Sequence, residues 1–118
     1  MSFVNKPGKT SAWRKMVIRH QVSDIFSYGK IVTTFTKAKE TQKHVDRIVT
    51  LAKSGSLAAI RAIDAIILPT KKDTKQTLTK KILEIGKKYN KRQGGYTRVL
   101  RLQTRKGDRT TEAIIELV

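Results

Sequence analysis

The sequence contains no cysteine, which excludes disulfide bonds and thiolate metal ligands and fits a reducing compartment. Long apolar runs are missing too: no stretch approaches the roughly 18 to 20 apolar residues that span a bilayer. The opening segment, "MSFVNKPGK", lacks the apolar core of a secretory signal peptide. From these absences we expect a cytoplasmic protein without a membrane segment.

Acidic residues are scarce as well. The chain has 9 Asp and Glu against 26 Lys and Arg, which gives a formal net charge of +17 and a pI near 10.6. Such a chain repels itself unless a polyanion neutralises it. Nucleic acid, an acidic membrane surface and an acidic protein are the candidate partners. Nucleic acid is favoured because the basic residues are interleaved with segments that look folded, whereas a lipid surface would need one basic amphipathic helix.

Groups that carry out catalysis are few. The two histidines, His20 and His44, fall in different expected helices without a cluster of acids, and a metal site needs three or four ligands. The Gly94-Gly95 pair precedes a strand and lacks the spacing of a phosphate-binding loop. Glu112 and Glu116 alternate with apolar residues, which favours a solvated strand face over acid-base catalysis. The sequence predicts no enzyme, and no cofactor, metal or small-molecule substrate.

At 118 residues the chain is long enough for one core, so we expect one domain over residues 10–118. We expect the basic leader, residues 1–9, to order only on RNA. Apolar residues recur at helical spacing in four segments, and β-branched residues dominate three others. The expected order is helix 12–27, strand 30–36, helix 37–53, helix 57–68, a helix capped by Asp73 or Thr74 that reaches Tyr89, and strands 97–104 and 110–117. Helix 57–68, with its nearly unbroken apolar run, is expected to be the most buried.

This order predicts an α+β fold: a helix, a strand, three helices and a C-terminal β-hairpin, with the helices packed on one face of a small sheet. The hairpin is expected to turn at residues 106–108. Matching like with like on each face gives its expected register: Val99 with Ile114, Leu100 with Ala113, and Arg101 with Glu112.

Positive charge is concentrated in two stretches. Nine Lys and Arg lie between Gly86 and Arg109 against the single acid Asp108, and a second cluster lies near the amino terminus. Because a guanidinium matches phosphate geometry, arginines are the stronger candidates for contact with nucleic acid. The bare backbone at Gly94-Gly95 allows either a close approach to phosphate or a purely structural turn. The candidate residues are Lys9, Arg14, Lys15, Arg19, Lys91, Arg92, Gly94, Gly95, Tyr96, Arg98, Arg101, Arg105 and Lys106.

Two aromatic residues have open alternatives. Tyr96 can stack on a base or ribose, or pack in the core under the hairpin, since it shares strand parity with Leu100 and Leu102. Trp13 lies off the apolar stripe of its helix, and a lone tryptophan more often packs in a core or faces a partner than stacks on a base.

Several segments together resemble one family. They are "TKAKE" at residues 36–40, "VTLAK" at 49–53, and above all "GGYTRVLRL" at 94–102, followed by "RKGD" and "AIIELV". Over residues 13–118 the chain is similar to the seventeenth family of bacterial large-subunit ribosomal proteins. The resemblance implies a structural protein, one copy per ribosome, that binds large-subunit ribosomal RNA near the exit of the nascent-peptide tunnel, beside other large-subunit proteins.

The family's characteristic residues map onto the strand-to-helix junction and the hairpin. They are Thr33, Thr34, Lys37, Ala38, Lys39, Glu40, Gly94, Gly95, Tyr96, Thr97, Arg98, Gly107 and Asp108. By this resemblance Lys37, Lys39 and Thr97 join the candidate RNA-binding residues. A helix amino terminus at Lys37 and Lys39 would also present free amides to a phosphate. Residues 1–9 depart from the Arg-, His- and Lys-rich leader of the family.

Two rival functions remain from the sequence. A general DNA- or RNA-compacting protein would bind unrelated duplexes as tightly as ribosomal RNA, but dimer-forming heptads and a groove-reading helix are missing. An RNA-modifying enzyme would need a converging acid, histidine or cofactor loop, which the sequence does not offer.

Overall fold

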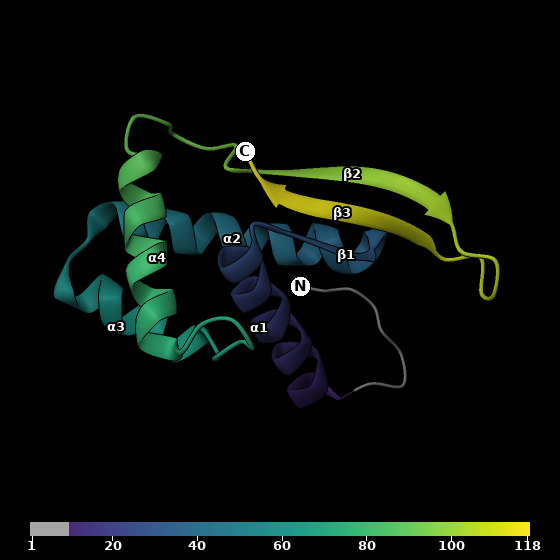
Figure 1. Cartoon of the computed structure of the whole chain (residues 1–118), viewed down its shortest axis with the longest axis horizontal. Coiled ribbons are helices and arrows are strands. Elements are labelled where there is room, and N and C mark those ends of the chain that lie inside the picture. The colour runs from purple at the N-terminus through teal and green to yellow at the C-terminus, as the bar shows by residue number, and fades with distance from the viewer. Residues whose placement is uncertain (1–9) are drawn as a thin grey trace.

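The computed structural model describes residues 10–118 (Figure 1), so the predicted leader, including Lys9, lies outside the described residues. The chain begins with helix α1, Ser11–Tyr28. The Thr10 side chain accepts a hydrogen bond from the Trp13 amide, and Gly29 ends the helix with φ 90°. A threonine hydroxyl satisfies a free amide at the start of a helix, and glycine takes the left-handed conformation without strain.

Strand β1 is Lys30–Thr34, two residues shorter than predicted. Thr34 has extended dihedrals, and its side chain accepts a hydrogen bond from the Lys37 amide at 3.4 Å. Helix α2, Phe35–Ser54, therefore begins at Phe35. The prediction of strand through residue 36 was wrong because capping by Thr34 outweighs the β propensity of the two residues after it.

Helix α2 is the centre of the fold, and it packs against α1, α3, α4 and all three strands. Helix α3 is Leu57–Ile66, and helix α4 is Lys75–Lys88. Six residues of α2 are buried but only Ala59 and Ile63 of α3, whose Leu57 is 63% exposed. The prediction that the third helix is the most buried was wrong, because α3 lies at the rim of the helical layer and packs mainly on α2 and α4.

Helices α2 and α4 cross at very close range. A Cβ built on Gly86 of α4 would lie 2.6 Å from the carbonyl carbon of Ala52 in α2. Glycine is thus required at this crossing by space rather than by backbone conformation. The contact brings the end of α4, and the loop after it, against the last turns of α2.

A buried polar cluster joins α1 to the start of α4. The Ser27 hydroxyl donates to Asp73 at 2.5 Å, and the Lys81 ammonium donates to the same carboxylate at 2.9 Å. These hydrogen bonds, with that of Ser27 first, lower the pKa of Asp73 below its ordinary value. Lys81 also donates to the Ser27 carbonyl at 3.1 Å.

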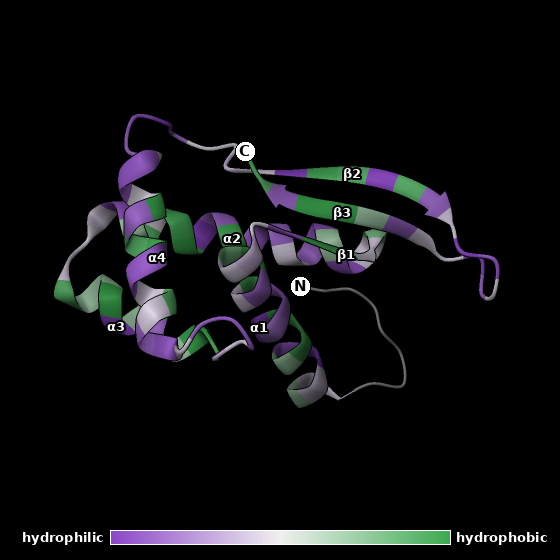
Figure 2. Ribbon diagram, viewed as in Figure 1, coloured by the Kyte–Doolittle hydropathy of each residue, from purple (hydrophilic) through white to green (hydrophobic). Residues whose placement is uncertain are grey.

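The sheet is antiparallel, with the strand order β1-β3-β2, where β2 is Thr97–Thr104 and β3 is Thr111–Leu117. Helices α1 and α2 pack on one side of it, which confirms the predicted α+β architecture. Residues of that side include the buried Ala113 and Ile115 of β3. Figure 2 shows apolar and polar bands along β2. Val99 and Leu100 are consecutive in this strand and lie on opposite sides of the sheet, so apolar side chains reach the uncovered face as well.

The predicted hairpin register was wrong by one residue. The structure pairs Val99 with Ile115 and Leu100 with Ile114, so that Arg101 faces Ala113 rather than an acid. A β-bulge between Arg101 and Thr104 shifts the register on the way from the turn. The turn itself is wider than three residues, because the Arg105 amide bonds to the Thr110 carbonyl at 2.9 Å.

Candidate nucleic-acid interface

The loop between α4 and β2 is basic and exposed. We call residues 90–95 the glycine loop; all six are exposed, including Lys91 and Arg92. Gly95 has φ +66°, so its conformation favours glycine. Gly94 does not have a positive φ, and a Cβ at this position would meet no atom within 4 Å. The turn therefore accounts for Gly95, whereas nothing in the fold requires glycine at position 94.

Tyr96 follows the glycine loop and is buried, with its ring centre 5.4 Å from that of Tyr89. Its hydroxyl donates to the Arg92 carbonyl at 3.1 Å and accepts from the Lys53 ammonium at 2.8 Å. The structure thus takes the core alternative for Tyr96, and the ring is not exposed for stacking on a base. Lys53 also donates to the Arg92 carbonyl, so it holds the loop from the end of α2.

Lys53 was not among the candidate residues predicted from the sequence. Its role depends on the packing of α2 against the glycine loop. This contact joins residues about forty positions apart, so no local sequence pattern indicates it. Arg92 is also fixed within the fold, since its guanidinium donates to the Gly95 carbonyl at 3.3 Å and lies 5.1 Å from the Tyr89 ring centre. Lys91 and the backbone of Gly94 are also exposed parts of the loop.

Thr97 is buried at the start of β2, although the resemblance marked it as a candidate contact. Its hydroxyl donates to the Asp46 carboxylate at 3.2 Å. Burial raises the pKa of Asp46, and the bond from Thr97 opposes that rise. The geometry gives Thr97 a role in fixing β2 on α2 rather than direct contact with a ligand.

A second basic group lies at the other end of the sheet, near the start of α2. The Arg101 guanidinium lies 4.3 Å from the Phe35 ring centre, and the Lys39 ammonium lies 5.8 Å from the same ring. The hairpin turn continues outward from there (Figure 1). We call this group the hairpin end; its residues are Lys37, Lys39, Arg101, Arg105 and Lys106. The structure thus brings together cations that the sequence placed in separate elements.

The amino-terminal turn of α1 joins the hairpin end. The Lys37 ammonium lies 5.5 Å from the ring centre of Trp13, which is partly exposed. Arg14 and Lys15 follow Trp13 in the same turn of α1. Trp13 is not a core residue. Of the two alternatives to base stacking, packing in a core and facing a partner, the structure favours the second.

Arg19 is used inside the fold. Its guanidinium donates to the carbonyls of Ile66 at 2.8 Å and Ala65 at 3.4 Å. These carbonyls belong to the last turn of α3, where they lack helical partners. Arg19 therefore joins α1 to α3, and it is not presented to solvent in the way that a phosphate contact would require.

Two of the candidate arginines, Arg98 and Arg105, form ion pairs. Arg98 lies 3.7 Å from Glu116, and Arg105 lies 2.9 Å from Asp108. A hydrogen bond from the Thr110 amide, followed by the interaction with Arg105, lowers the pKa of Asp108. Ion pairs between exposed side chains are weak and can exchange with other partners, so Arg105 stays accessible to an anion.

The basic run from residue 87 to 109 does not form one patch. Strand β2 separates the glycine loop from the hairpin turn, and its eight residues span roughly 25 Å at about 3.3 Å each. The cations of this stretch therefore form two groups at opposite ends of the strand.

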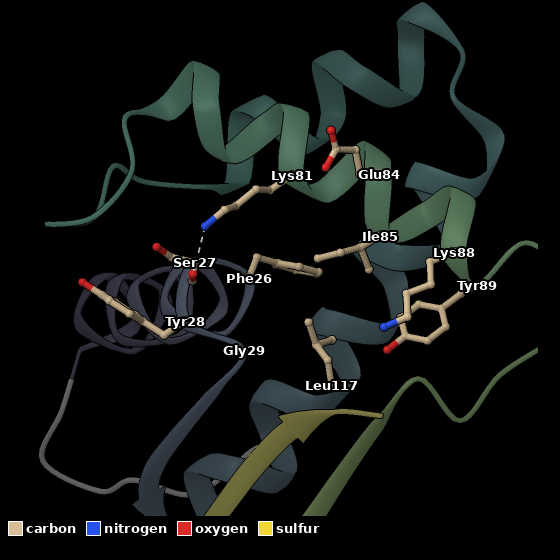
Figure 3. A pocket seen from close by; sticks show the side chains of 10 residues that line it. All are labelled: Phe26, Ser27, Tyr28, Gly29, Lys81, Glu84, Ile85, Lys88, Tyr89 and Leu117. Carbon is tan, nitrogen blue, oxygen red and sulfur yellow. Dashed lines mark hydrogen bonds between the residues drawn. The ribbon is translucent and has the colours of Figure 1, made fainter.

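An open groove lies between the end of α1, α4 and the end of β3 (Figure 3). It has a volume of about 540 Å³, and its apolar wall includes Phe26, Ile85 and Leu117. Two lysines of α4 line the groove: Lys81 is bonded to Ser27 and Asp73, and the Lys88 ammonium lies 5.8 Å from the Tyr89 ring centre. Glu84 lines it as well, so the groove carries charges of both signs and does not favour an anion.

The described residues contain no arrangement of three or more His, Cys, Asp or Glu side chains that could hold a metal ion. Every helix within residues 10–118 is too short or too polar to cross a lipid bilayer. A small α+β protein with a net charge of +17 and cations on exposed loops and helix ends fits the class of nucleic-acid-binding proteins.

Comparison with known proteins narrows this class to one family. Residues 17–118 match the family described as ribosomal protein L17. The chain is 57% identical to the large ribosomal subunit protein bL17 of Ureaplasma parvum and 56% identical to that of Malacoplasma penetrans, over the full length of each. It is 48% identical to the protein of the same name from Mycoplasma pneumoniae, over 99% of this chain and 95% of the relative.

The chain therefore belongs to the ribosomal protein L17 family. It is a structural constituent of the large ribosomal subunit and not an enzyme. Its place is the ribosome, which in bacteria lies in the cytoplasm. The resemblance identified from the sequence motifs is confirmed.

Proposed function

We propose that residues 10–118 form one domain that binds large-subunit ribosomal RNA through two surfaces, the glycine loop and the hairpin end. The carrying observation is the placement of cations on a chain of net charge +17: both surfaces consist of exposed loops or helix ends. Backbone phosphates are the ligands that such surfaces bind, and release of their counterions drives the binding. Shape, set by the spacing of the two surfaces, then selects the site on the RNA.

The glycine loop supports close approach of a phosphate. Gly94 has open space around it and no positive φ, so an alanine would fold there as well. Absence of a side chain at such a position is useful where another backbone comes close. Lys91 supplies a charge beside it, and Lys53 and Tyr96 hold the loop in place from below.

The hairpin end offers charge together with aromatic rings. Lys37 and Lys39 stand at the start of α2, where the helix dipole and free amides also favour an anion. Arg101 is held in position by the Phe35 ring. Arg105 and Lys106 extend the surface to the hairpin turn, and Arg14 and Lys15 extend it onto α1.

The finer location follows from the family resemblance rather than from the geometry. The motifs "GGYTRVLRL" and "RKGD" support a place near the exit of the nascent-peptide tunnel, at one copy per ribosome and beside other large-subunit proteins. Pelleting ribosomes through sucrose at low and high salt, with quantification by mass spectrometry, tests the stoichiometry. A substoichiometric protein that washes off with general nucleic-acid binders would contradict it.

The direct test of RNA binding uses filter binding to large-subunit ribosomal RNA over a salt series. Lys91→Ala and Lys106→Ala should each weaken binding and reduce the salt slope by about one. Gly94→Val should weaken binding without changing that slope, because it blocks an approach but removes no charge. Lys80→Ala, an exposed lysine of α4 outside both surfaces, is the control. If Lys91→Ala, Lys106→Ala, Gly94→Val and the control all lose the same affinity, binding comes from the overall positive charge and not from a defined site. Equal affinity for an unrelated duplex would mean the same.

A further inference from the structure

The side of the sheet opposite α1 and α2 is an outer face that no described helix covers. Side chains alternate between the two sides of each strand, so the residues that neighbour the buried Ala113 and Ile115 point outward. Three rows cross the strands by register. The outer face consists of Lys30, Val32 and Thr34 of β1, Glu112, Ile114 and Glu116 of β3, and Arg98 and Leu100 of β2.

The middle row of the outer face is apolar. Val32 pairs with Ile114, and Ile114 pairs with Leu100 on its other side. Val32 is 58% exposed and Leu100 is 45% exposed. Leu102, also exposed, lies two residues farther along β2. Val32, the half-buried Ile114 and Leu100 thus form a continuous apolar row, whereas exposed apolar residues such as Leu57 and Met16 stand on separate helices.

The outer face is formally neutral on a strongly basic protein. Lys30 and Arg98 contribute two positive charges, and Glu112 and Glu116 contribute two negative ones. Arg98 and Glu116 form an ion pair at 3.7 Å. A phosphate approaching the apolar row would meet a carboxylate on each side of Ile114. The face is therefore unsuited to RNA, and its apolar row with charges of both signs matches the composition of protein interfaces.

We propose that this outer face docks a neighbouring protein of the large subunit, which covers the apolar row and complements the mixed charges around it. The inference rests on the proposed function, because it takes the neighbour to be held on the same ribosomal RNA. It separates the surfaces of the molecule by partner: RNA at the glycine loop and hairpin end, protein at the outer face.

Size favours a ribosomal neighbour over a second copy of this chain. Strands lie about 4.8 Å apart and residues about 3.3 Å apart, so three strands of four residues cover on the order of 150 to 250 Å². A stable interface between free proteins buries about 800 Å² per partner. A patch of this size suffices only where a scaffold already holds both proteins close, at an effective concentration near the millimolar range. Assembly on ribosomal RNA meets that condition.

The experiment is site-specific photo-crosslinking within intact large subunits. The photoreactive residue p-benzoylphenylalanine replaces Val32 or Leu100 on the outer face, or Gly94 in the glycine loop. Subunits purified from cells that carry each variant are irradiated and digested with nuclease and protease, and mass spectrometry identifies the cross-linked species. Positions 32 and 100 should cross-link to peptides of another large-subunit protein, and position 94 should cross-link to nucleotides.

Each outcome bears on a separate proposal. Cross-links from positions 32 and 100 to RNA, to a second copy of this chain, or to nothing would overturn docking at the outer face. Failure of position 94 to cross-link to RNA counts against the proposed function instead.

A second pair of variants, Leu100→Lys and Leu57→Lys, compares two exposed leucines. Leu100→Lys should lower, several-fold, the amount of the neighbouring protein that stays with salt-washed subunits, where this neighbour is the one identified by cross-linking. Leu57→Lys should leave that amount unchanged. Equal amounts in both variants would also refute the docking.

Discussion

Gly86→Ala is expected to destabilise the protein through the crossing of α2 and α4. The new Cβ would lie 2.6 Å from the carbonyl carbon, 2.7 Å from the Cβ and 2.8 Å from the oxygen of Ala52. Non-bonded carbon atoms prefer about 3.5 to 4.0 Å, so the two helices must separate by up to about 1 Å. Two of the three contacts are to backbone atoms, which no side-chain rotation can relieve.

The magnitude follows from two opposing effects. Overpacking a core costs about 1 to 3 kcal/mol, and contacts to backbone favour the upper part of this range. Alanine in place of glycine inside a helix gains about 1 kcal/mol. We therefore expect a net loss of about 1 to 2 kcal/mol in the free energy of unfolding. At about 2.1 cal/mol/K per residue the unfolding entropy is about 250 cal/mol/K, so Tm should fall by about 4 to 8 °C.

Thermal unfolding followed by circular dichroism measures this shift on the full chain. Gly94→Ala is the matched control, because its new Cβ would meet no atom within 4 Å and its φ is not positive. The control should leave Tm nearly unchanged. An unchanged or raised Tm for Gly86→Ala would refute the reasoning, since helix propensity alone would then decide the outcome.

Three further predictions concern single side chains. The pKa of Asp73 is lowered, so the stability that its hydrogen bonds contribute is present above the ordinary pKa of 3.8 and is lost as the pH falls. Asp73→Asn should therefore be less stable than the unchanged protein at pH 7. Urea titrations at several pH values should show this difference in the free energy of unfolding shrinking toward pH 3. Arg109 has φ 56°, so Arg109→Asn should raise the free energy of unfolding by a few tenths to about 1 kcal/mol in urea denaturation, and a lower value would contradict the strain. Tyr96→Phe removes the hydroxyl that bonds to Lys53 and should lower the free energy of unfolding by about 1 to 2 kcal/mol. Amide hydrogen exchange in the glycine loop should become faster. Unchanged exchange in the loop would mean that this hydrogen bond does not hold it.

Several ends of the helices depend on local chemistry and lie within two residues of the predicted ranges, although the prediction missed Thr34 as the cap of α2. Thr10, Ser56 and Thr74 each cap the helix that follows by accepting a hydrogen bond from an amide three residues on. Gly29 and Gly55 end helices in the left-handed conformation. These decisions involve only neighbours in sequence, so single residues carry the information.

The features that the sequence did not predict depend on contacts between distant residues. The hairpin register follows from a bulge near Arg101 and a wide turn, and a shift by one residue leaves the same alternating pattern in the sequence. Arg19 looked like a surface cation, but it bonds to the end of α3, more than forty residues away. Charge patterns identified the basic residues correctly but could not show that β2 divides them into two groups.

Helix α2 has a consequence for how the protein could act within a large assembly. It has 20 residues, and at 1.5 Å per residue it is about 30 Å long. Its first turn carries Lys37 at the hairpin end, and Lys53 in its last turn holds the glycine loop. One rigid rod thus sets the distance between the two proposed RNA contacts. The protein would then hold two segments of folded RNA at a fixed separation, set by the length of α2.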